Sequence, residues 1–137
     1  MAVNEYPEGW EGWLAFLGAQ LPGPVRRQEH ENGALTFTAG EPPLVVVRLT
    51  PAAIRVARVI RVSRRAGSTF VQYRWIGRIA WGHLPGRRAV HLVEQFVTVA
   101  RELRMAVYRT CFVCNRRLPP EWMEEDTDIC RRCGRRG

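Results

Sequence analysis

The C-terminal part of the chain reads Cys111-Phe112-Val113-Cys114 and, after a connection of 15 residues, Cys130-Arg131-Arg132-Cys133. These are all four cysteines of a 137-residue protein. Two C-x2-C pairs about 15 to 20 residues apart are typical of a tetrahedral four-thiolate metal site, because each short pair occupies one edge of the tetrahedron. The pattern therefore predicts a small metal-organised unit in this part of the chain.

Zinc is the metal that the spacing predicts, with Cys111, Cys114, Cys130 and Cys133 as its ligands. Iron stays open, since a single iron ion or an iron–sulfur cluster also uses four thiolates. The other interpretations are a redox-active C-x-x-C pair and buried thiols that only fill space. A segment this short buries too little apolar surface to order itself, so the metal would supply most of its folding free energy.

The length of the chain suits one domain plus a small metal module, or one compact unit. We divide it into an α+β domain over residues 1–109 and a four-cysteine zinc module over residues 110–137. No run of 18 or more apolar residues is present, and the first residues lack the basic start and apolar stretch of a secretory signal. Thiolates kept for a metal suit a reducing compartment. We therefore expect a soluble, cytoplasmic protein with no membrane partner.

Hydrophobic patterns predict an α+β fold made of an N-terminal helix, an antiparallel meander of about four strands, a long helix and a C-terminal zinc-ribbon-like finger. The first helix ends before Pro22-Gly23-Pro24, and the long helix spans residues 87–108. Residues 34–39, 44–49 and 68–81 are rich in β-branched and aromatic residues and are separated by short polar breaks. These three runs are the clearest strands.

Residues 50–66 are ambiguous between strand and helix. Thr50-Pro51 looks like a helix start, and Gly67 looks like a helix C-terminal cap. Against this, β-branched residues recur at alternate positions, and this pattern favours a strand; they are Ile54, Val56, Ile60 and Val62. Residues 25–32 are interpreted as a connection, with a short edge strand as the alternative.

Charge is distributed unevenly along the chain. All 21 strongly basic residues are arginine. Residues 1–47 hold two arginines and six acidic residues, residues 48–110 hold thirteen and two, and residues 111–137 hold six and five. A high-GC coding sequence would also favour arginine over lysine, but guanidinium groups bind phosphates bidentately and stack on aromatic rings whatever their origin. The middle of the chain is the electropositive part.

This electropositive segment predicts a nucleic-acid-binding sheet face. A turn at Gly67 would place arginines of the preceding strand beside Arg74 and Arg78, and strand alternation would put Tyr73 and Trp75 on the other side. Arginines would neutralise phosphates, and the two rings would stack on unpaired bases. The alternatives are aromatic core residues and a solvated or protein-binding arginine surface. The candidate residues are Arg55, Arg61, Arg65, Arg74, Arg78, Tyr73, Trp75, Arg87 and Arg88.

The segments around the two cysteine pairs, residues 111–122 and 129–134, resemble in outline the C-terminal finger of the TraR/DksA family. Members of that family bind RNA polymerase, so the resemblance implies the four cysteine ligands and a polymerase partner. We predict a zinc-containing nucleic-acid-binding protein, for DNA or RNA, that acts in transcription or nucleic-acid handling. The alternative is a protein-interaction adaptor that docks on RNA polymerase or another large complex.

An enzyme is not predicted. His91 and Glu94 lie three residues apart on the long helix and His83 precedes it, but no nucleophile motif, phosphate-cradling glycine loop or H-E-x-x-H sequence accompanies them. A metal with four thiolate ligands has no open position at which to activate water. The sequence therefore favours a protein that acts by binding, without a small-molecule substrate.

Overall fold

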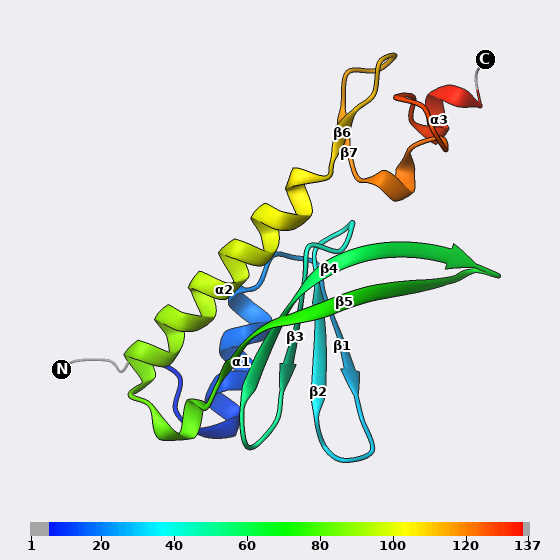
Figure 1. The fold of residues 1–137 in the computed structure, drawn as a ribbon. Helices are drawn as coiled ribbons and strands as arrows, with labels where there is room; N and C mark the ends of the chain where they lie inside the picture. The colour runs from blue at the N-terminus through cyan, green and yellow to red at the C-terminus, as the bar shows by residue number, and fades with distance from the viewer. Residues whose placement is uncertain (1–5, 136–137) are drawn as a thin grey trace.

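The computed structural model describes residues 6–135 and shows a five-stranded antiparallel sheet with two helices on one of its faces (Figure 1). The strand order is β1-β2-β3-β4-β5, so every strand pairs with its neighbour in sequence. A small cysteine-containing unit follows the second helix. The predicted α+β fold class is confirmed.

The sheet contains five strands where the sequence predicts about four. Their bounds are β1 Val25–Glu29, β2 Leu35–Ala39, β3 Val45–Leu49, β4 Ile54–Arg65 and β5 Ser68–Ile79. The edge strand β1 replaces the predicted connection. The strand interpretation of residues 54–65 is confirmed, because Thr50 caps a tight turn before β4 and starts no helix. The Oγ1 atom of Thr50 accepts hydrogen bonds from the backbone N–H groups of Ala52 and Ala53.

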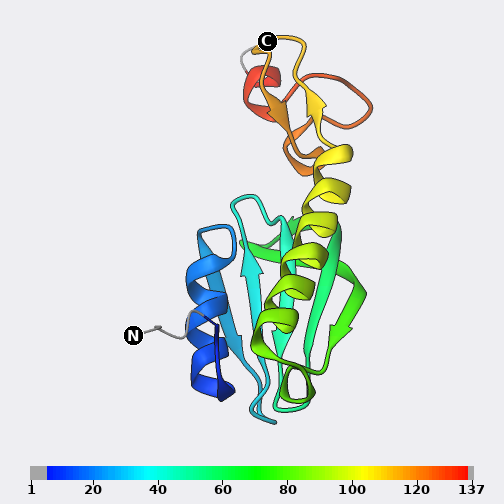
Figure 2. The same ribbon diagram turned by 90° about the vertical axis from the view of Figure 1, so that its left-hand side faces the viewer.

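Helices α1 (Gly9–Gln20) and α2 (Gly86–Ala106) lie side by side against the same face of the sheet (Figure 2). Their apolar side chains form the main core with residues of the central strands. Its fully or nearly fully buried members include Trp13, Leu17, Phe37, Val47, Leu49, Ile54, Val56, Ile79, Val93 and Ala100. A 3-10 turn, η1 (Trp81–His83), leads from β5 into α2. The two helices leave the opposite face of the sheet uncovered.

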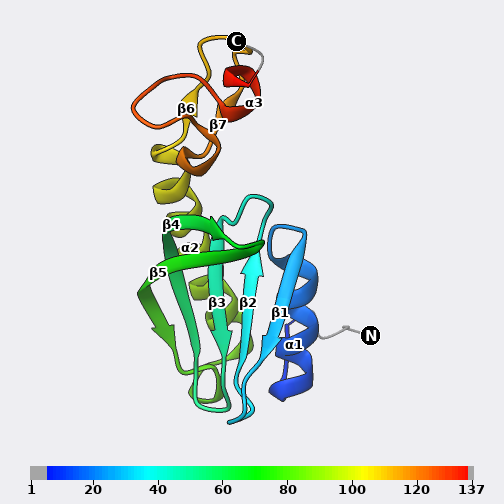
Figure 3. The same cartoon turned by 90° about the vertical axis from the view of Figure 1, so that its right-hand side faces the viewer.

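Strands β4 and β5 form a long hairpin that bends across that opposite face (Figure 3). The pairing shifts at two places, which leave Ile76 on β5 and Ile60 on β4 without partners. Such bulges increase the local twist and bend a strand. Beneath the bend, Val46, Val59 and Val62 form a second, smaller core with partly buried Tyr73. The bulges therefore turn part of the sheet back on itself.

The bulge at Ile76 corrects the predicted faces of β5. The sequence predicts Arg78 on the side of Arg74, opposite Trp75. Arg78 pairs instead with Arg55, whose guanidinium lies 4.7 Å from the centre of the Trp75 ring. One extra residue shifts the two-residue alternation, so Arg78 shares a face with Trp75 while Arg74 stays on the other.

We call residues 109–135 the cysteine unit. One buried ion pair joins this unit to α2. Arg104 is only 1% exposed, and its guanidinium pairs with the carboxylate of Glu121 in the 3-10 turn η2 (Pro120–Trp122). Its Nε donates to the backbone oxygen of Pro43 at 2.9 Å, and it lies 5.3 Å from the centre of the Tyr108 ring. Three segments distant in sequence thus meet at one side chain.

Gly77 provides a test of the packing between β5 and α2. A Cβ atom at this position would lie 2.6 Å from ring carbons of Phe96. Gly77→Ala is expected to lower the free energy of unfolding by about 1–3 kcal/mol, because the ring or the strand must move. Urea unfolding measures the change. Gly18→Ala is the control, since a Cβ there meets nothing within 4 Å, and it should stabilise α1 by about 0.5–1 kcal/mol. Equal changes in unfolding free energy for the two variants would contradict the close packing of Gly77 against Phe96.

The buried ion pair gives a second prediction. Glu121→Ala leaves the Arg104 charge buried without its carboxylate, and we expect it to lower the free energy of unfolding by about 3–5 kcal/mol. Glu125→Ala removes an exposed carboxylate from the same loop and should change stability by less than about 0.5 kcal/mol. Urea unfolding of the metal-loaded protein makes the comparison. Similar stabilities for the two variants would show that the pair is not what joins the units.

Candidate metal centre and arginine-rich face

The four cysteines come together in the cysteine unit from two separate places. Cys111 and Cys114 lie in the turn between β6 (Arg109–Thr110) and β7 (Arg117–Leu118). Cys130 precedes the short helix α3 (Arg131–Gly134), which carries Cys133. All four sulfur atoms lie within 4.8 Å of one another. The structure therefore brings together the complete set that the sequence predicts.

The spacing of the sulfurs fits a tetrahedral ion. A metal–sulfur bond of about 2.3 Å gives a tetrahedron with edges of about 3.8 Å, and the Sγ atoms of Cys114 and Cys130 are 3.9 Å apart. The backbone N–H groups of Cys114 and Cys130 donate to Cys111 Sγ at 3.5 and 3.3 Å. The N–H group of Cys133 donates to Cys130 Sγ at 3.5 Å. Such donors stabilise thiolates, so the set can hold one metal ion.

The thiols lie close enough to change one another's acidity. Hydrogen bonding from the backbone N–H of Cys114 lowers the pKa of Cys111 to about 6. The hydrogen bond with the sulfur of Cys130 raises the pKa of Cys133 to about 12. Four neighbouring thiolates would repel one another, so the thiols resist losing all their protons. A divalent cation between them offsets this repulsion. The donor set is therefore chemically suited to a cation.

The apolar core of the cysteine unit is small. Apart from the cysteines, its buried members are Leu118 and Met123, with partly buried Trp122 and Ile129 packed against them. Backbone hydrogen bonds connect its loops, among them Glu124 N–H to the oxygen of Ile129 at 2.8 Å. This core is too small to order the unit by burial alone. A bound metal would add to the stability that the hydrogen bonds and the ion pair of Glu121 provide.

The predicted nucleic-acid-binding residues do not form one continuous face. Arg55, Arg78, Tyr73 and Trp75 gather on the sheet face opposite the helices. Arg74 points from the other side of β5, and Arg61 and Arg65 lie on the outer half of the long hairpin. Arg87 and Arg88 lie in the first turn of α2. Only the first group makes a compact cluster.

The ring of Trp75 is already in contact with protein groups. The guanidinium carbons of Arg48 and Arg55 lie 5.1 and 4.7 Å from its centre, and Tyr73 meets it edge to face at 5.1 Å. Tyr73 and Trp75 are both partly buried against the smaller core. Both rings therefore contact other side chains of the chain itself, and their stacking on bases stays a prediction. Arg48 is not among the predicted site residues, and the cross-strand pairing that reveals it depends on register.

The arginines of the long hairpin form no ion pair within residues 6–135. β4 and β5 carry seven arginines and no acidic residue. The ion pairs formed among residues 6–135 involve Arg26, Arg104 and Arg109, which lie outside these two strands. Within residues 6–135, none of the seven arginines of the hairpin forms an ion pair.

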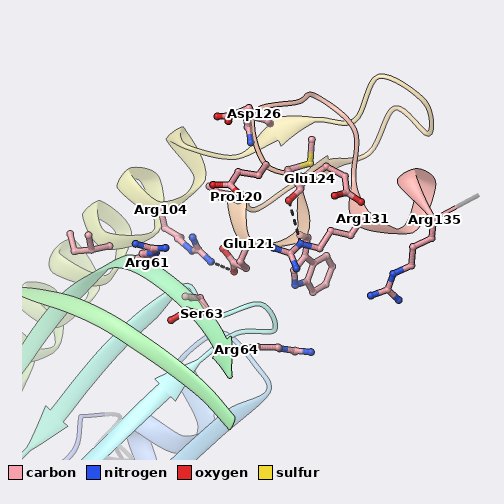
Figure 4. Close-up of a pocket in the computed structure, with 16 residues that line it drawn as sticks. Arg61, Ser63, Arg64, Arg104, Pro120, Glu121, Glu124, Asp126, Arg131 and Arg135 are labelled. Carbon is pink, nitrogen blue, oxygen red and sulfur yellow. Dashed lines mark hydrogen bonds and ion pairs between the residues drawn. The ribbon is translucent and has the colours of Figure 1, made fainter. Parts of the chain in front are cut away.

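A cleft of about 600 Å³ separates the outer half of β4 from the cysteine unit (Figure 4). Arg61 and Ser63 line it from β4, and Glu124 and Arg131 line it from the cysteine unit. Acidic and basic groups both line this cleft. It therefore does not continue the positive surface of the hairpin.

The fold and the cysteine cluster define an α+β protein with a four-cysteine metal-binding unit. No helix among residues 6–135 has both the length and the apolar character needed to cross a membrane. Comparison with protein-family models, curated proteins and solved structures finds no match. The resemblance to the TraR/DksA finger, the polymerase partner and the absence of catalysis stay predictions.

The metal site is tested by replacing one ligand. Cys130→Ser is expected to reduce the metal content of the purified, dialysed protein from about one ion per chain to near zero, because an incomplete set holds the ion weakly. Elemental analysis gives the stoichiometry. Arg132→Ser replaces an exposed residue that lies between Cys130 and Cys133 in sequence, and it should leave the metal content unchanged. Full metal content in the Cys130 variant would contradict the assignment.

Proposed function

We propose that this is a zinc-stabilised nucleic-acid-binding protein whose long hairpin contacts phosphate groups. The observation that carries the proposal is the set of seven arginines on β4 and β5 with no acidic partner among residues 6–135. Guanidinium groups that meet phosphates release condensed counterions, and this release supplies much of the affinity of nucleic-acid-binding proteins. The bent hairpin presents these groups from both of its sides.

Zinc is the proposed ion, and its proposed role is structural. Four sulfur ligands in a tetrahedral arrangement suit zinc or iron, and a closed set of four thiolates suits a zinc ion that organises a small unit. The ion would link the β6–β7 turn to α3 and thereby order the loop that carries Glu121. A role in transcription or nucleic-acid handling in the cytoplasm belongs to the same proposal.

A second candidate function is docking on a protein complex such as RNA polymerase. It is favoured by Phe112 and Val113, which lie between two cysteine ligands and are 85% and 62% exposed. Apolar side chains held outward on a metal-organised turn are suited to a pocket on a partner protein. In this candidate the cysteine unit is the contact and the arginines are a solvated surface.

Salt dependence distinguishes the two candidates. For labelled single-stranded and duplex oligonucleotides, log affinity is expected to fall with log salt at a slope of about −0.7 to −0.9 per phosphate bound. Arg61→Glu and Arg74→Glu should weaken all sequences alike, and each should make the slope shallower by about one, because one arginine–phosphate pair no longer forms. Fluorescence anisotropy across a salt series measures both quantities.

Two controls accompany this measurement. Arg101→Glu makes the same charge change at an exposed position on α2, outside the hairpin, and should have a smaller effect. Phe112→Ser with Val113→Ser should leave oligonucleotide affinity unchanged. Weak binding of every oligonucleotide at physiological salt, or equal losses for Arg101→Glu and Arg74→Glu, would contradict the nucleic-acid proposal and favour the docking candidate.

A further inference from the structure

Three arginines stand next to one another across the sheet face opposite the helices. Arg48 on β3 pairs with Arg55 on β4, and Arg55 pairs with Arg78 on β5. We call these three residues the arginine row. Neighbouring strands lie about 4.8 Å apart, and like charges placed directly opposite each other destabilise a sheet. Such a row requires something that offsets its charge.

The carboxylates of the described residues form their ion pairs with other arginines. None of the ion pairs formed among residues 6–135 involves the arginine row. The Nε atom of Arg55 is buried, yet it has no hydrogen-bond partner among the residues described. A buried donor on a charged group is costly to leave unpaired. The row therefore has unused capacity to bind an anion.

Aromatic and hydroxyl groups hold the guanidinium groups in place. Arg48 and Arg55 both lie over the ring of Trp75. Arg48 also donates from Nε to Thr36 Oγ1 and from Nη2 to the hydroxyl of Tyr73, each at 3.4 Å. Groups fixed in this way lose less conformational freedom when a ligand binds. The arrangement is thus organised before binding.

The row lines a pocket of about 610 Å³. His30, Asn32 and Thr50 contribute further polar groups to its wall, and Nε2 of His30 lies 2.7 Å from Thr36 Oγ1. Glu31, which is exposed, is the one acidic residue among the described lining residues. The pocket therefore combines three guanidinium groups with several other hydrogen-bonding side chains and the exposed carboxylate of Glu31.

We propose that this pocket is a phosphate-binding site in which Arg48, Arg55 and Arg78 bind the oxygen atoms of a phosphate or diphosphate group. The planar guanidinium matches two phosphate oxygens at once, and a charge-assisted pair of this kind is about twice as strong as a neutral hydrogen bond. The phosphate belongs to a nucleic acid or to a small phosphorylated molecule. The site goes beyond the proposed function, because it is a discrete pocket that does not depend on Arg61 or Arg74.

The test uses inorganic pyrophosphate as the probe and isothermal titration of the full-length, metal-loaded protein. We expect saturable binding, and Arg78→Gln should weaken it by about tenfold or more, the effect of losing one charged hydrogen-bonding group. Arg78 is exposed, so its replacement should leave folding intact, which thermal unfolding checks. Arg74→Gln is the matched control, with the same loss of charge on the opposite face of the same strand. It should leave affinity within about twofold.

A second readout uses the wild-type protein alone. The arginine Nε–H signals of Arg48 and Arg55 in a nitrogen–proton correlation spectrum should shift on addition of pyrophosphate. The proposal is overturned if pyrophosphate does not bind saturably, if these signals stay in place, or if Arg74→Gln and Arg78→Gln weaken binding equally.

A competition arm identifies the source of the phosphate and separates this site from the proposed function. Displacement of a labelled oligonucleotide by pyrophosphate would assign the pocket to nucleic-acid phosphates. Pyrophosphate binding without oligonucleotide binding would keep the pocket, assign it to a small phosphorylated molecule and reject the nucleic-acid function. Oligonucleotide binding without pyrophosphate binding would reject the pocket and keep that function.

Discussion

The buried charge of Arg104 determines how the two parts of the molecule are joined. A desolvated guanidinium must be matched by surrounding groups, and here they come from a strand connection (Pro43), the end of the same helix (Tyr108) and the cysteine unit (Glu121). Glu121 lies between the two cysteine pairs, so its position depends on how that unit closes. Folding of the cysteine unit and its attachment to α2 are therefore coupled through one carboxylate, and a metal that orders the unit would also strengthen the attachment.

The two faces of the sheet differ in character. The face covered by α1 and α2 is apolar and contains the main core, whereas the opposite face is partly closed by the bend of its own last two strands. Two bulges, at Ile76 and Ile60, interrupt the pairing of these strands, and the one at Ile76 also places Arg78 beside Arg55. Trp75 packs against the smaller core, and its ring also contacts the guanidinium groups of Arg48 and Arg55.

The sequence predicts the elements of this fold and the metal ligands better than it predicts which side chains share a surface. Cysteine spacing is a local chemical pattern, and its four members are found together. The faces of β5 depend on register, and one unpaired residue at Ile76 reverses the alternation beyond it. Strand β1 is missed because four of its five side chains are exposed, which leaves no apolar alternation. Arg104 follows Ala100 by four residues on the buried side of α2, but an arginine is normally expected to be exposed, and its burial depends on Pro43 and Glu121, which are far away in sequence.

The exposed side chains of β1 affect how the sheet ends. A strand at the edge of a sheet has backbone groups free on one side, and a strand from another molecule can add there and start aggregation. In β1, Arg26, Arg27 and Glu29 are all exposed, so charged groups stand along this border on both faces. An incoming strand would have to place its own side chains beside them and remove them from water. The charged side chains of β1, the strand with the weakest sequence pattern, therefore disfavour the addition of a strand from another molecule at this edge.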